Sequence, residues 1–343
     1  MCLHQNRIPR NVLDRRPKVA DVAARAGVST ATVDRVINGR GGVHQKTIAR
    51  VEEAIREIVG GRLPAPDPAH RFDVVLSGER GGGTKALADA FARAAENAGA
   101  NVEVSFVDTM NPDALAERLR ACAQRGSSGI AVQVLDHALV RDAVAELAGA
   151  NIRVVTVLTD ITGIDHLGYF GLDNRAAGRT AGFLMGRFCR GGGKLAVVWG
   201  GQLYRSHEER ESGFRSVLRA ARPDLQSVEL ITGNDNPEMT FARVRDALDL
   251  HKDLIGIYCV GGGIAGAADA IERAGLAPQI VLIGHNYNPE TKPYLLSGTI
   301  HALIHQDMDR IAADALACLS AQKPAAAARI PIEIITRENP MYR

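Results

Sequence analysis

Two different spacings of hydrophobic residues follow one another along the chain. In residues 19–59 apolar side chains recur every three or four positions, which is the spacing of a helix with one buried face. This pattern predicts three short helices: 19–26, 30–37 and 46–59. Gly27 supplies a turn between the first two because it tolerates a positive φ, and Ser29 is placed to cap the second helix.

From residue 71 onward, short apolar runs alternate with amphipathic helical segments such as 86–99 and 112–126. The runs expected to form strands are 72–76, 102–107, 129–134, 153–158, 167–171, 195–199, 228–231, 255–260, 280–283, 299–304 and 330–336. This alternation predicts α/β architecture with parallel sheets that are covered by helices on both faces. A single sheet of so many strands would be very wide, so we expect two lobes. Ligands of such sheets bind at the carboxyl ends of strands, and a cleft between two lobes collects these ends from both.

Composition favours a soluble globular protein. The chain has 343 residues, of which 46% are hydrophobic and 23% charged, and this length suits about two domains. No run approaches the ~18 apolar residues of a membrane span, and residues 1–16 lack the apolar core of a secretory signal. The cysteines are scattered and odd in number: Cys2, Cys122, Cys189, Cys259 and Cys318. They predict reduced cytoplasmic thiols, without a disulfide framework or a metal site.

The charge of the chain is unevenly distributed. Residues 1–62 contain 12 Lys+Arg and 6 Asp+Glu, whereas the remainder of the chain has a net charge of −4. A basic head on a mildly acidic body indicates that the head binds a polyanion.

Within the head, three short helices with a glycine turn predict a helix-turn-helix, whose second helix enters the major groove of DNA. The second helix would turn three apolar residues inward: Val33, Val36 and Ile37. It would leave a mainly polar set outside: Thr30, Ala31, Asp34, Arg35 and Asn38.

The run VADVAARAGVSTATVDRVINGRGGVHQKTIARVEEAI resembles the DNA-binding head of the lactose-repressor (LacI) family of bacterial transcription regulators. The elements DVA, AGVS, TV, RV, N, V and K-T match in order and without gaps. The resemblance implies that Thr30 and Ala31 face base edges and that Arg35 reads a guanine or holds a phosphate. The full set of DNA-binding residues that it implies is Ser29, Thr30, Ala31, Thr32, Asp34, Arg35, Asn38 and His44.

Three features depart from this family. Asp34 stands where a small hydroxyl residue is usual, and His44 replaces the usual serine, so the operator sequence cannot be transferred. The family's third helix is followed by a short hinge helix, whereas residues 62–70 of this chain contain Pro64, Pro66 and Pro68. Because proline fixes φ and restricts the preceding residue, we expect an extended, semi-rigid spacer here.

The body resembles the periplasmic-binding-protein-like effector domain of the same family over most of residues 71–340. The matching segments are GLDN with AG at 171–178, ERESGF at 209–214, IG at 283–284, and GTI at 298–300 leading to Gln306. The implied domains are a head at 17–61, a linker at 62–70 and a body at 71–340. Its lobes would comprise about 71–170 with 305–325, and about 172–303 with 328–340.

The resemblance assigns a ligand-gripping arginine to Arg210, whose guanidinium suits vicinal hydroxyls or a carboxylate. Positions at the strand ends and in the matching segments complete the candidate effector site: Glu79, Arg80, Asp136, His137, Asp160, His207, Arg210, Gly262, Asn286 and Gln306. Asp136, His137 and Asp160 could instead cap the helices that follow them. Because residues 77–85 contain no aromatic side chain to stack on a sugar ring, the possible effectors include a polyol, a sugar acid and a sugar phosphate besides a plain sugar.

Two glycine-rich segments partly match the motifs of nucleotide-binding proteins. The sequence GGGIAG at 261–266 satisfies the dinucleotide-binding pattern G-x-G-x-x-G, but no acidic residue ends the next strand. Residues 78–85 end Gly-Thr-Lys and therefore fail the phosphate-binding pattern of ATPases. We expect no cofactor and no enzyme activity. The alternatives are an exported solute-binding protein and a nicotinamide-dependent enzyme.

The sequence therefore predicts a cytoplasmic, allosteric transcription regulator of repressor type. It would bind a near-palindromic operator as a homodimer, since residues 333–343 contain no leucine heptads for a tetramer. A small polar effector would control its operator affinity.

Overall fold

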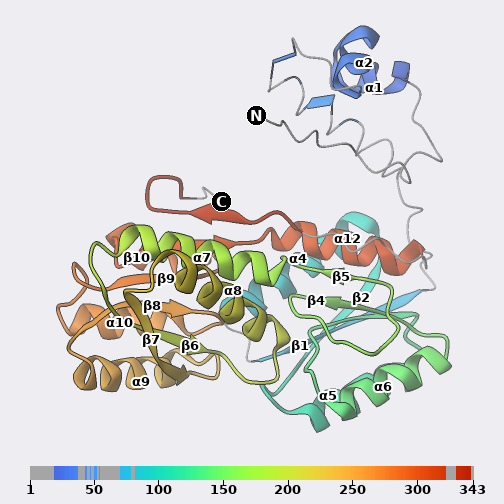
Figure 1. The fold of residues 1–343 in the computed structure, drawn as a ribbon. Coiled ribbons are helices and arrows are strands. Elements are labelled where there is room, and N and C mark those ends of the chain that lie inside the picture. Colours follow the sequence, from blue (N-terminus) through green and yellow to red (C-terminus); the bar gives the residue numbers. More distant parts are fainter. Residues whose placement is uncertain are drawn as a thin grey trace. The chain divides into compact units, whose positions relative to one another are not determined.

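The computed structural model describes residues 19–37, 43–44, 47, 50–51, 54, 70–78, 82–321 and 330–340. The chain divides into two compact units, Met1–Ala65 and Pro66–Arg343 (Figure 1). Residues 62–69 of the predicted linker 62–70 and the candidate residues Asn38, Glu79 and Arg80 lie outside the described residues.

The first unit contains helix α1 (Val19–Ala26) and helix α2 (Thr30–Ile37), with the bounds that the hydrophobic spacing predicts. Residues 47, 50, 51 and 54, from the predicted third helix, are helical. The three segments share one small core: Val22, Ala23, Ala26, Val33, Val51 and Ala54. Val19 is 38% exposed, whereas the spacing of Val19, Val22, Ala23 and Ala26 along the helix predicts that all four lie on the buried face.

The turn between α1 and α2 is held from both sides. Gly27 has φ +59°, and the Arg50 guanidinium donates to the Ala26 carbonyl at 2.5 Å from the far side of the turn. The Ser29 Oγ accepts from the Thr32 backbone N–H at 3.2 Å, as an N-cap does. The predicted turn and cap are therefore confirmed, and they fix the angle at which α2 leaves α1.

The second unit begins with a five-stranded parallel sheet in the order β2-β1-β3-β4-β5. Its strands are β1 (Arg71–Ser77), β2 (Asn101–Val107), β3 (Gly129–Val132), β4 (Arg153–Val157) and β5 (Tyr169–Phe170). Helices cover both of its faces: α4 (Gly82–Ala98) with α12 (Met308–Ala321), and α5 (Pro112–Gln124) with α6 (Ala138–Gly149). We call this sheet and its helices lobe 1.

A second sheet has the order β11-β10-β9-β8-β6-β7, and only β11 among these strands is antiparallel to its neighbour. Its strands are β6 (Gly193–Trp199), β7 (Leu225–Thr232), β8 (Leu254–Cys259), β9 (Val281–His285), β10 (Ile300–His305) and β11 (Glu333–Ile335). Its helices are α7 (Asn174–Phe188), α8 (Arg205–Ala221), α9 (Pro237–Leu250), α10 (Ile264–Arg273) and the short α11 (Lys292–Ser297). We call this sheet and its helices lobe 2.

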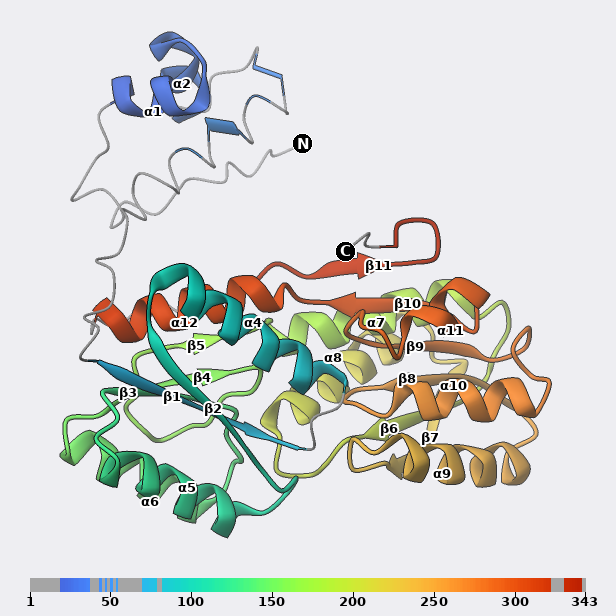
Figure 2. The ribbon, with the colours of Figure 1, turned by 180° about the vertical axis from the view of Figure 1, so that it is seen from behind.

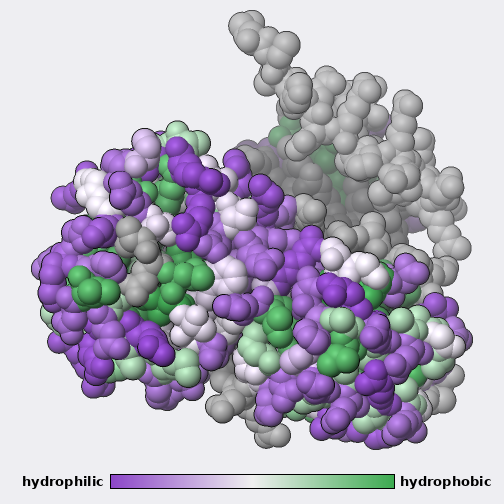
Figure 3. Space-filling model, turned by 60° about the horizontal axis from the view of Figure 1, so that its bottom comes forward, coloured by the Kyte–Doolittle hydropathy of each residue, from purple (hydrophilic) through white to green (hydrophobic). Residues whose placement is uncertain are grey.

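The helices carry their apolar residues on one side and polar residues on the other. One apolar core continues from lobe 1 into lobe 2 and includes Phe72, Phe91, Phe170 and Phe214, all nearly inaccessible to solvent. The face that brings α5, α6 and α9 forward is mainly hydrophilic, with small apolar patches between polar side chains (Figure 3). This is the distribution expected for helices that cover a sheet on one side and face water on the other.

The chain passes between the lobes after β5, after β10 and after α12. Figure 2 shows the consequence: β10 belongs to lobe 2, whereas α12, which follows it directly, packs beside α4 on lobe 1. The expected α/β fold with two parallel-sheet lobes is confirmed. Because the strands point towards the junction, their carboxyl ends from both sheets meet there.

Candidate functional site

The candidate DNA surface lies on α2 and the residue before it. Ser29, Thr30, Ala31 and Arg35 are exposed, while the opposite side of α2 places Val33 in the core of the head. Thr32 and Asp34 are half-buried, and His44 is exposed beyond α2. The first turn of α2 thus presents a hydroxyl and a methyl group, the groups that can contact base edges and thymine methyls.

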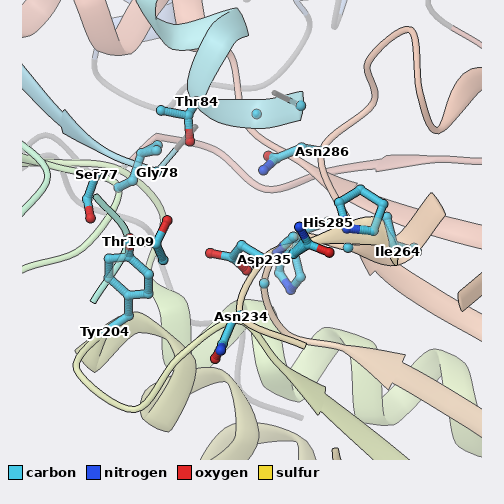
Figure 4. Close-up of a pocket in the computed structure, with 18 of the residues that line it drawn as sticks. Ser77, Gly78, Thr84, Thr109, Tyr204, Asn234, Asp235, Ile264, His285 and Asn286 are labelled. Carbon is cyan, nitrogen blue, oxygen red and sulfur yellow. Dashed lines mark hydrogen bonds between the residues drawn. The ribbon is translucent and has the colours of Figure 1, made fainter. Parts of the chain in front are cut away.

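A cavity of about 920 Å³ lies between lobes 1 and 2 (Figure 4). From lobe 1 it is lined by residues at or just beyond the ends of four strands: Ser77, Gly78, Phe106, Asp108, Thr109, Gln133 and Leu158. From lobe 2 it is lined by the corresponding residues: Asn234, Asp235, Gly261, Gly262, His285, Asn286 and Gln306. This is the place where open parallel sheets bind their ligands.

Arg210, on α8, lines the cavity although only 5% of its surface is exposed. Its Nε donates to Asn174 Oδ1 at 2.9 Å and its Nη1 to the Val260 carbonyl at 2.6 Å. Within the described residues no carboxylate lies close enough to form an ion pair with it, and burial lowers its pKa from the ordinary value. Because a buried charge is stabilised by hydrogen-bond acceptors, Arg210 is a candidate to bind a polar group in the cavity.

Two glycines fix the position of Arg210. Helices α7 and α8 pack so closely that a Cβ at Gly178 would fall far inside contact distance of the Arg210 carbonyl oxygen. A Cβ at Gly213, one turn further along α8, would overlap the backbone of Arg175 in the same way. The glycines in the segments that resemble the effector domain therefore set the approach of α8, and with it the place of the guanidinium.

Two buried histidines form another part of the wall. The His207 Nδ1 lies 3.3 Å from the Gly201 carbonyl, and burial lowers its pKa to about 4. The His285 Nε2 lies 2.8 Å from the Tyr258 hydroxyl, and burial likewise lowers the pKa of His285 well below its ordinary value. Its other ring nitrogen, Nδ1, makes no hydrogen bond with any described residue. Both imidazoles are therefore neutral near pH 7 and can donate or accept a hydrogen bond.

Asp235 points into the cavity from the loop after β7 (Figure 4). Its Oδ1 accepts from the Gly262 backbone N–H at 2.5 Å. Asn234 and Asp235 both adopt left-handed backbone conformations, with φ of +52° and +55°. Such conformations cost energy in residues other than glycine and concentrate at functional sites. Neither residue was among the predicted site residues, although both lie just beyond a strand, as Asn286 does.

Asn286 and Gln306 lie side by side beyond β9 and β10. The Gln306 Nε2 donates to Asn286 Oδ1 at 3.4 Å, while the Gln306 Oε1 is buried without a partner among the described residues. Aromatic side chains also reach the wall, namely Phe106 from β2 and Tyr204 from the loop before α8. Neither residue lies after the first strand, where the sequence pattern was expected to place an aromatic side chain, so the two were not among the predicted site residues.

Of the candidate effector residues, the structure brings five to the cavity: His207, Arg210, Gly262, Asn286 and Gln306. Asp136, His137 and Asp160 lie outside its lining. Asp136 forms an ion pair with Arg141, and the His137 Nδ1 accepts from the Leu139 N–H at 3.3 Å as the cap of α6.

Asp160 is likewise occupied within its own lobe. It accepts from the Thr156 hydroxyl at 2.8 Å and lies 3.2 Å from the His166 Nε2. The reason for these three corrections is geometric. The residues that face the cavity are the first ones beyond β3 and β4, Gln133 and Leu158, whereas these carboxylates and His137 come later in the loops.

The glycine motif at 261–266 has a local explanation. Gly262 lines the cavity, and a Cβ at Gly266 would overlap the Pro237 carbonyl, because α10 packs closely on α9.

Among the helices that the structure describes, none combines the length and the apolar character needed to span a membrane.

Comparison with known proteins agrees with this geometry. The sequence model of the family described as periplasmic binding protein domain matches residues 74–323, and that of the bacterial regulatory proteins of the lacI family matches residues 18–59. A D-ribose/D-allose-binding protein of Pseudomonas aeruginosa is 27% identical over 177 residues, which cover 49% of this chain and 55% of that protein. The chain thus matches only about half the length of this curated relative.

Solved structures share the fold of the second unit. A solute-binding protein of an ABC transporter from Burkholderia graminis, in complex with D-arabinose, has a TM-score of 0.75 and 21% identity over 80% of this chain and 97% of its own. A proposed LacI transcriptional regulator from Bacteroides fragilis has a TM-score of 0.72 and 16% identity over 79% of this chain and 98% of its own. The chain belongs to the periplasmic-binding-protein family, and it is of the LacI type, with a lacI-family DNA-binding head in front of that domain.

Proposed function

We propose that this protein is a sequence-specific transcription regulator, acting as a cytoplasmic repressor, whose operator affinity is controlled by a small polar effector bound between lobes 1 and 2. One observation carries the proposal. The same chain contains a capped helix-turn-helix matched by the lacI family and a polar cavity at the strand ends of a periplasmic-binding-protein domain. Neither part alone would favour regulation by a ligand.

The DNA surface would consist of the residues on and beside α2. Thr30 and Ala31 would contact base edges, while Arg35 would contact guanine or phosphate. Ser29, Thr32, Asp34, Asn38 and His44 would complete the surface and set its register. Two heads of a homodimer would bind the two halves of a near-palindromic operator.

The charges that line the cavity limit the chemical class of effector that it can bind. Its described lining contains four carboxylates, Asp108, Asp235, Glu238 and Glu290, against a single guanidinium, Arg210. Like charges would repel a carboxylate or phosphate on the ligand. A second observation points the same way: the N-terminus of α4, a position suited to a phosphate, already binds the Glu290 carboxylate at 2.9 Å.

An uncharged sugar or polyol therefore fits better than a sugar acid or a sugar phosphate. Its hydroxyls would bind Arg210, Asp235 and the Asn286–Gln306 pair, while its apolar ring faces would lie against Phe106 and Tyr204. The ligands named for the related proteins, D-ribose, D-allose and D-arabinose, belong to this class.

A second function is favoured by the same relatives, several of which are solute-binding proteins. Such a protein would bind the sugar without a role for DNA. The discriminating experiment is selection of DNA from a random duplex library by the full chain, followed by affinity measurements at two salt concentrations.

An enriched near-palindrome that binds far more tightly than random DNA, and more weakly at higher salt, would support the regulator. Repeating the selection with a sugar found by thermal shift covers the case in which the effector promotes binding. If neither selection enriches a sequence, the solute-binding function replaces the regulator.

A further inference from the structure

A hydrogen bond joins the two lobes beside the cavity. Glu290 lies on the loop between β9 and α11 of lobe 2, and its Oε1 accepts from the backbone N–H of Gly82 at 2.9 Å. Gly82 is the first residue of α4, in lobe 1. Both residues line the cavity, so this contact closes one part of its border.

The end of α4 is a favourable place for a carboxylate. The first N–H groups of a helix have no partner within the helix, and they carry partial positive charge. Helix α4 has no acidic residue in its own first turn, as is also true of α6, α7 and α10. For α4, lobe 2 supplies a carboxylate across the cavity.

The loop that carries Glu290 is held rigidly. The Asn288 Oδ1 accepts from the N–H groups of Glu290 and Thr291, both at 3.0 Å. The Thr291 Oγ accepts from the Asn288 N–H at 3.0 Å, and Asn288 and Thr291 are both buried. Because these bonds lie within lobe 2, the loop can present Glu290 in the same position whether or not lobe 1 is near.

Glycines on lobe 1 allow the close approach. Gly82 has φ +52°, and a Cβ there would lie 3.2 Å from Glu290 Oε2. A Cβ at Gly83 would lie 3.0 Å from the Asn286 Nδ2. The glycine run that resembles an incomplete phosphate-binding loop thus has a different use, which is to receive the side chains of the opposite lobe.

We propose that Glu290 is a latch between the lobes. Its carboxylate caps α4 only while the lobes are closed, so opening the cavity requires this bond to break. The latch raises the fraction of closed protein before any effector binds. A ligand that binds the closed form would then bind more tightly in proportion to that fraction.

The test measures the distance between lobes 1 and 2 in the full chain without a ligand. Spin labels are attached at Glu117→Cys on α5 and Arg243→Cys on α9, two exposed sites away from the crossover of β10 into α12. The four described cysteines are buried, and Cys2→Ser removes the remaining one. Distance distributions are compared between the parent protein, Glu290→Gln and Glu290→Lys.

Glu290→Gln is expected to raise the open-to-closed ratio about fivefold, the effect of losing one charged helix cap on an equilibrium. Glu290→Lys is expected to open the lobes further, because it places a positive charge at the positive end of α4. The matched control is Glu96→Gln, which removes the same charge from an exposed position on the same helix. Unfolding midpoints show that each variant is folded. Distributions for both Glu290 variants that coincide with the control would overturn the latch.

Discussion

At the scale of single residues, the cavity combines one buried cation, Arg210, with carboxylates and neutral polar groups. Arg210 is fixed by Asn174 and the Val260 carbonyl, and the pKa values of His207 and His285 are lowered by burial. Asp235 is fixed by the Gly262 N–H. Each group is thus positioned before a ligand arrives, which reduces the entropy lost on binding.

Arg210→Met is expected to weaken sugar binding by about 10- to 150-fold, because about 1.5–3 kcal/mol of charge-assisted hydrogen bonding is lost. Binding is measured by calorimetry with the sugar that gives the largest thermal shift in a screen. Arg243→Met, an exposed arginine on α9, is the control and should bind as the parent does. Equal affinity in both variants would contradict the place given to Arg210.

His207 predicts a pH dependence of stability. Its folded-state pKa of about 4 lies below the ordinary value of 6.5, so between these values the unfolded state binds the proton and the folded state does not. The contribution of neutral His207 to the free energy of unfolding is therefore fully present above pH 6.5. It is lost as the pH falls towards 4, at up to ~1.4 kcal/mol per pH unit.

Urea unfolding of the parent and of His207→Gln between pH 4 and 8 tests this. The variant should show a flatter dependence on pH, whereas His251→Gln, outside the cavity at the end of α9, should retain the slope of the parent. Parallel curves for the parent and His207→Gln would show that His207 is not held neutral.

At the scale of elements, the contact between α7 and α8 positions the site. Gly178→Ala is expected to destabilise the protein by about 1–3 kcal/mol, since its Cβ has no room beside the Arg210 carbonyl. It should also weaken sugar binding, because α8 must move. Gly149→Ala, at the end of α6 with no neighbour within 4 Å, is the control and should leave both quantities nearly unchanged. Denaturation and calorimetry measure the two effects, and wild-type values for Gly178→Ala would refute the packing argument.

At the scale of the whole molecule, regulation requires that the head and the cavity influence each other. Whatever factor the sugar applies to the dissociation constant of the operator, the operator must apply to that of the sugar. We expect a factor of about 5–150, the usual range for such coupling. Calorimetric titration of the sugar with and without saturating operator measures one side, and DNA binding with and without sugar measures the other. A change on neither side would indicate a head and a cavity that work independently.

The predictability of the fold also depends on scale. The bounds of α1 and α2 and the positions of the strands follow from local spacing, since a buried helical face or a buried strand needs apolar residues at fixed intervals. The spacing gives the wrong burial for Val19, because tertiary packing decides which part of a helical face is covered. In so small a head, only part of that face meets a partner.

The site was less predictable than the fold. The rule that ligands bind beyond strand ends led to Asn286 and Gln306, which line the cavity, and equally to Asp136 and Asp160, which do not. The rule gives the loop but not the residue of the loop whose side chain faces the cavity. That choice depends on where each strand stops and on which neighbours compete for the side chain, such as Arg141 for Asp136.

By itself, the sequence determined the two kinds of domain and the helix-turn-helix with its glycine turn and serine cap. These features are encoded in spacings of a few residues, where backbone geometry leaves little choice. Only the tertiary structure decided that Asp235 enters the cavity, that Asp136 and Asp160 stay out, and that Glu290 reaches α4. The Glu290 contact joins residues 208 positions apart, so it depends on how the two sheets are placed side by side, which no local pattern contains. Asp136 and Asp160 have partners close in the sequence, Arg141 and Thr156, but the folded loops decide that these side chains bond to one another rather than face the cavity.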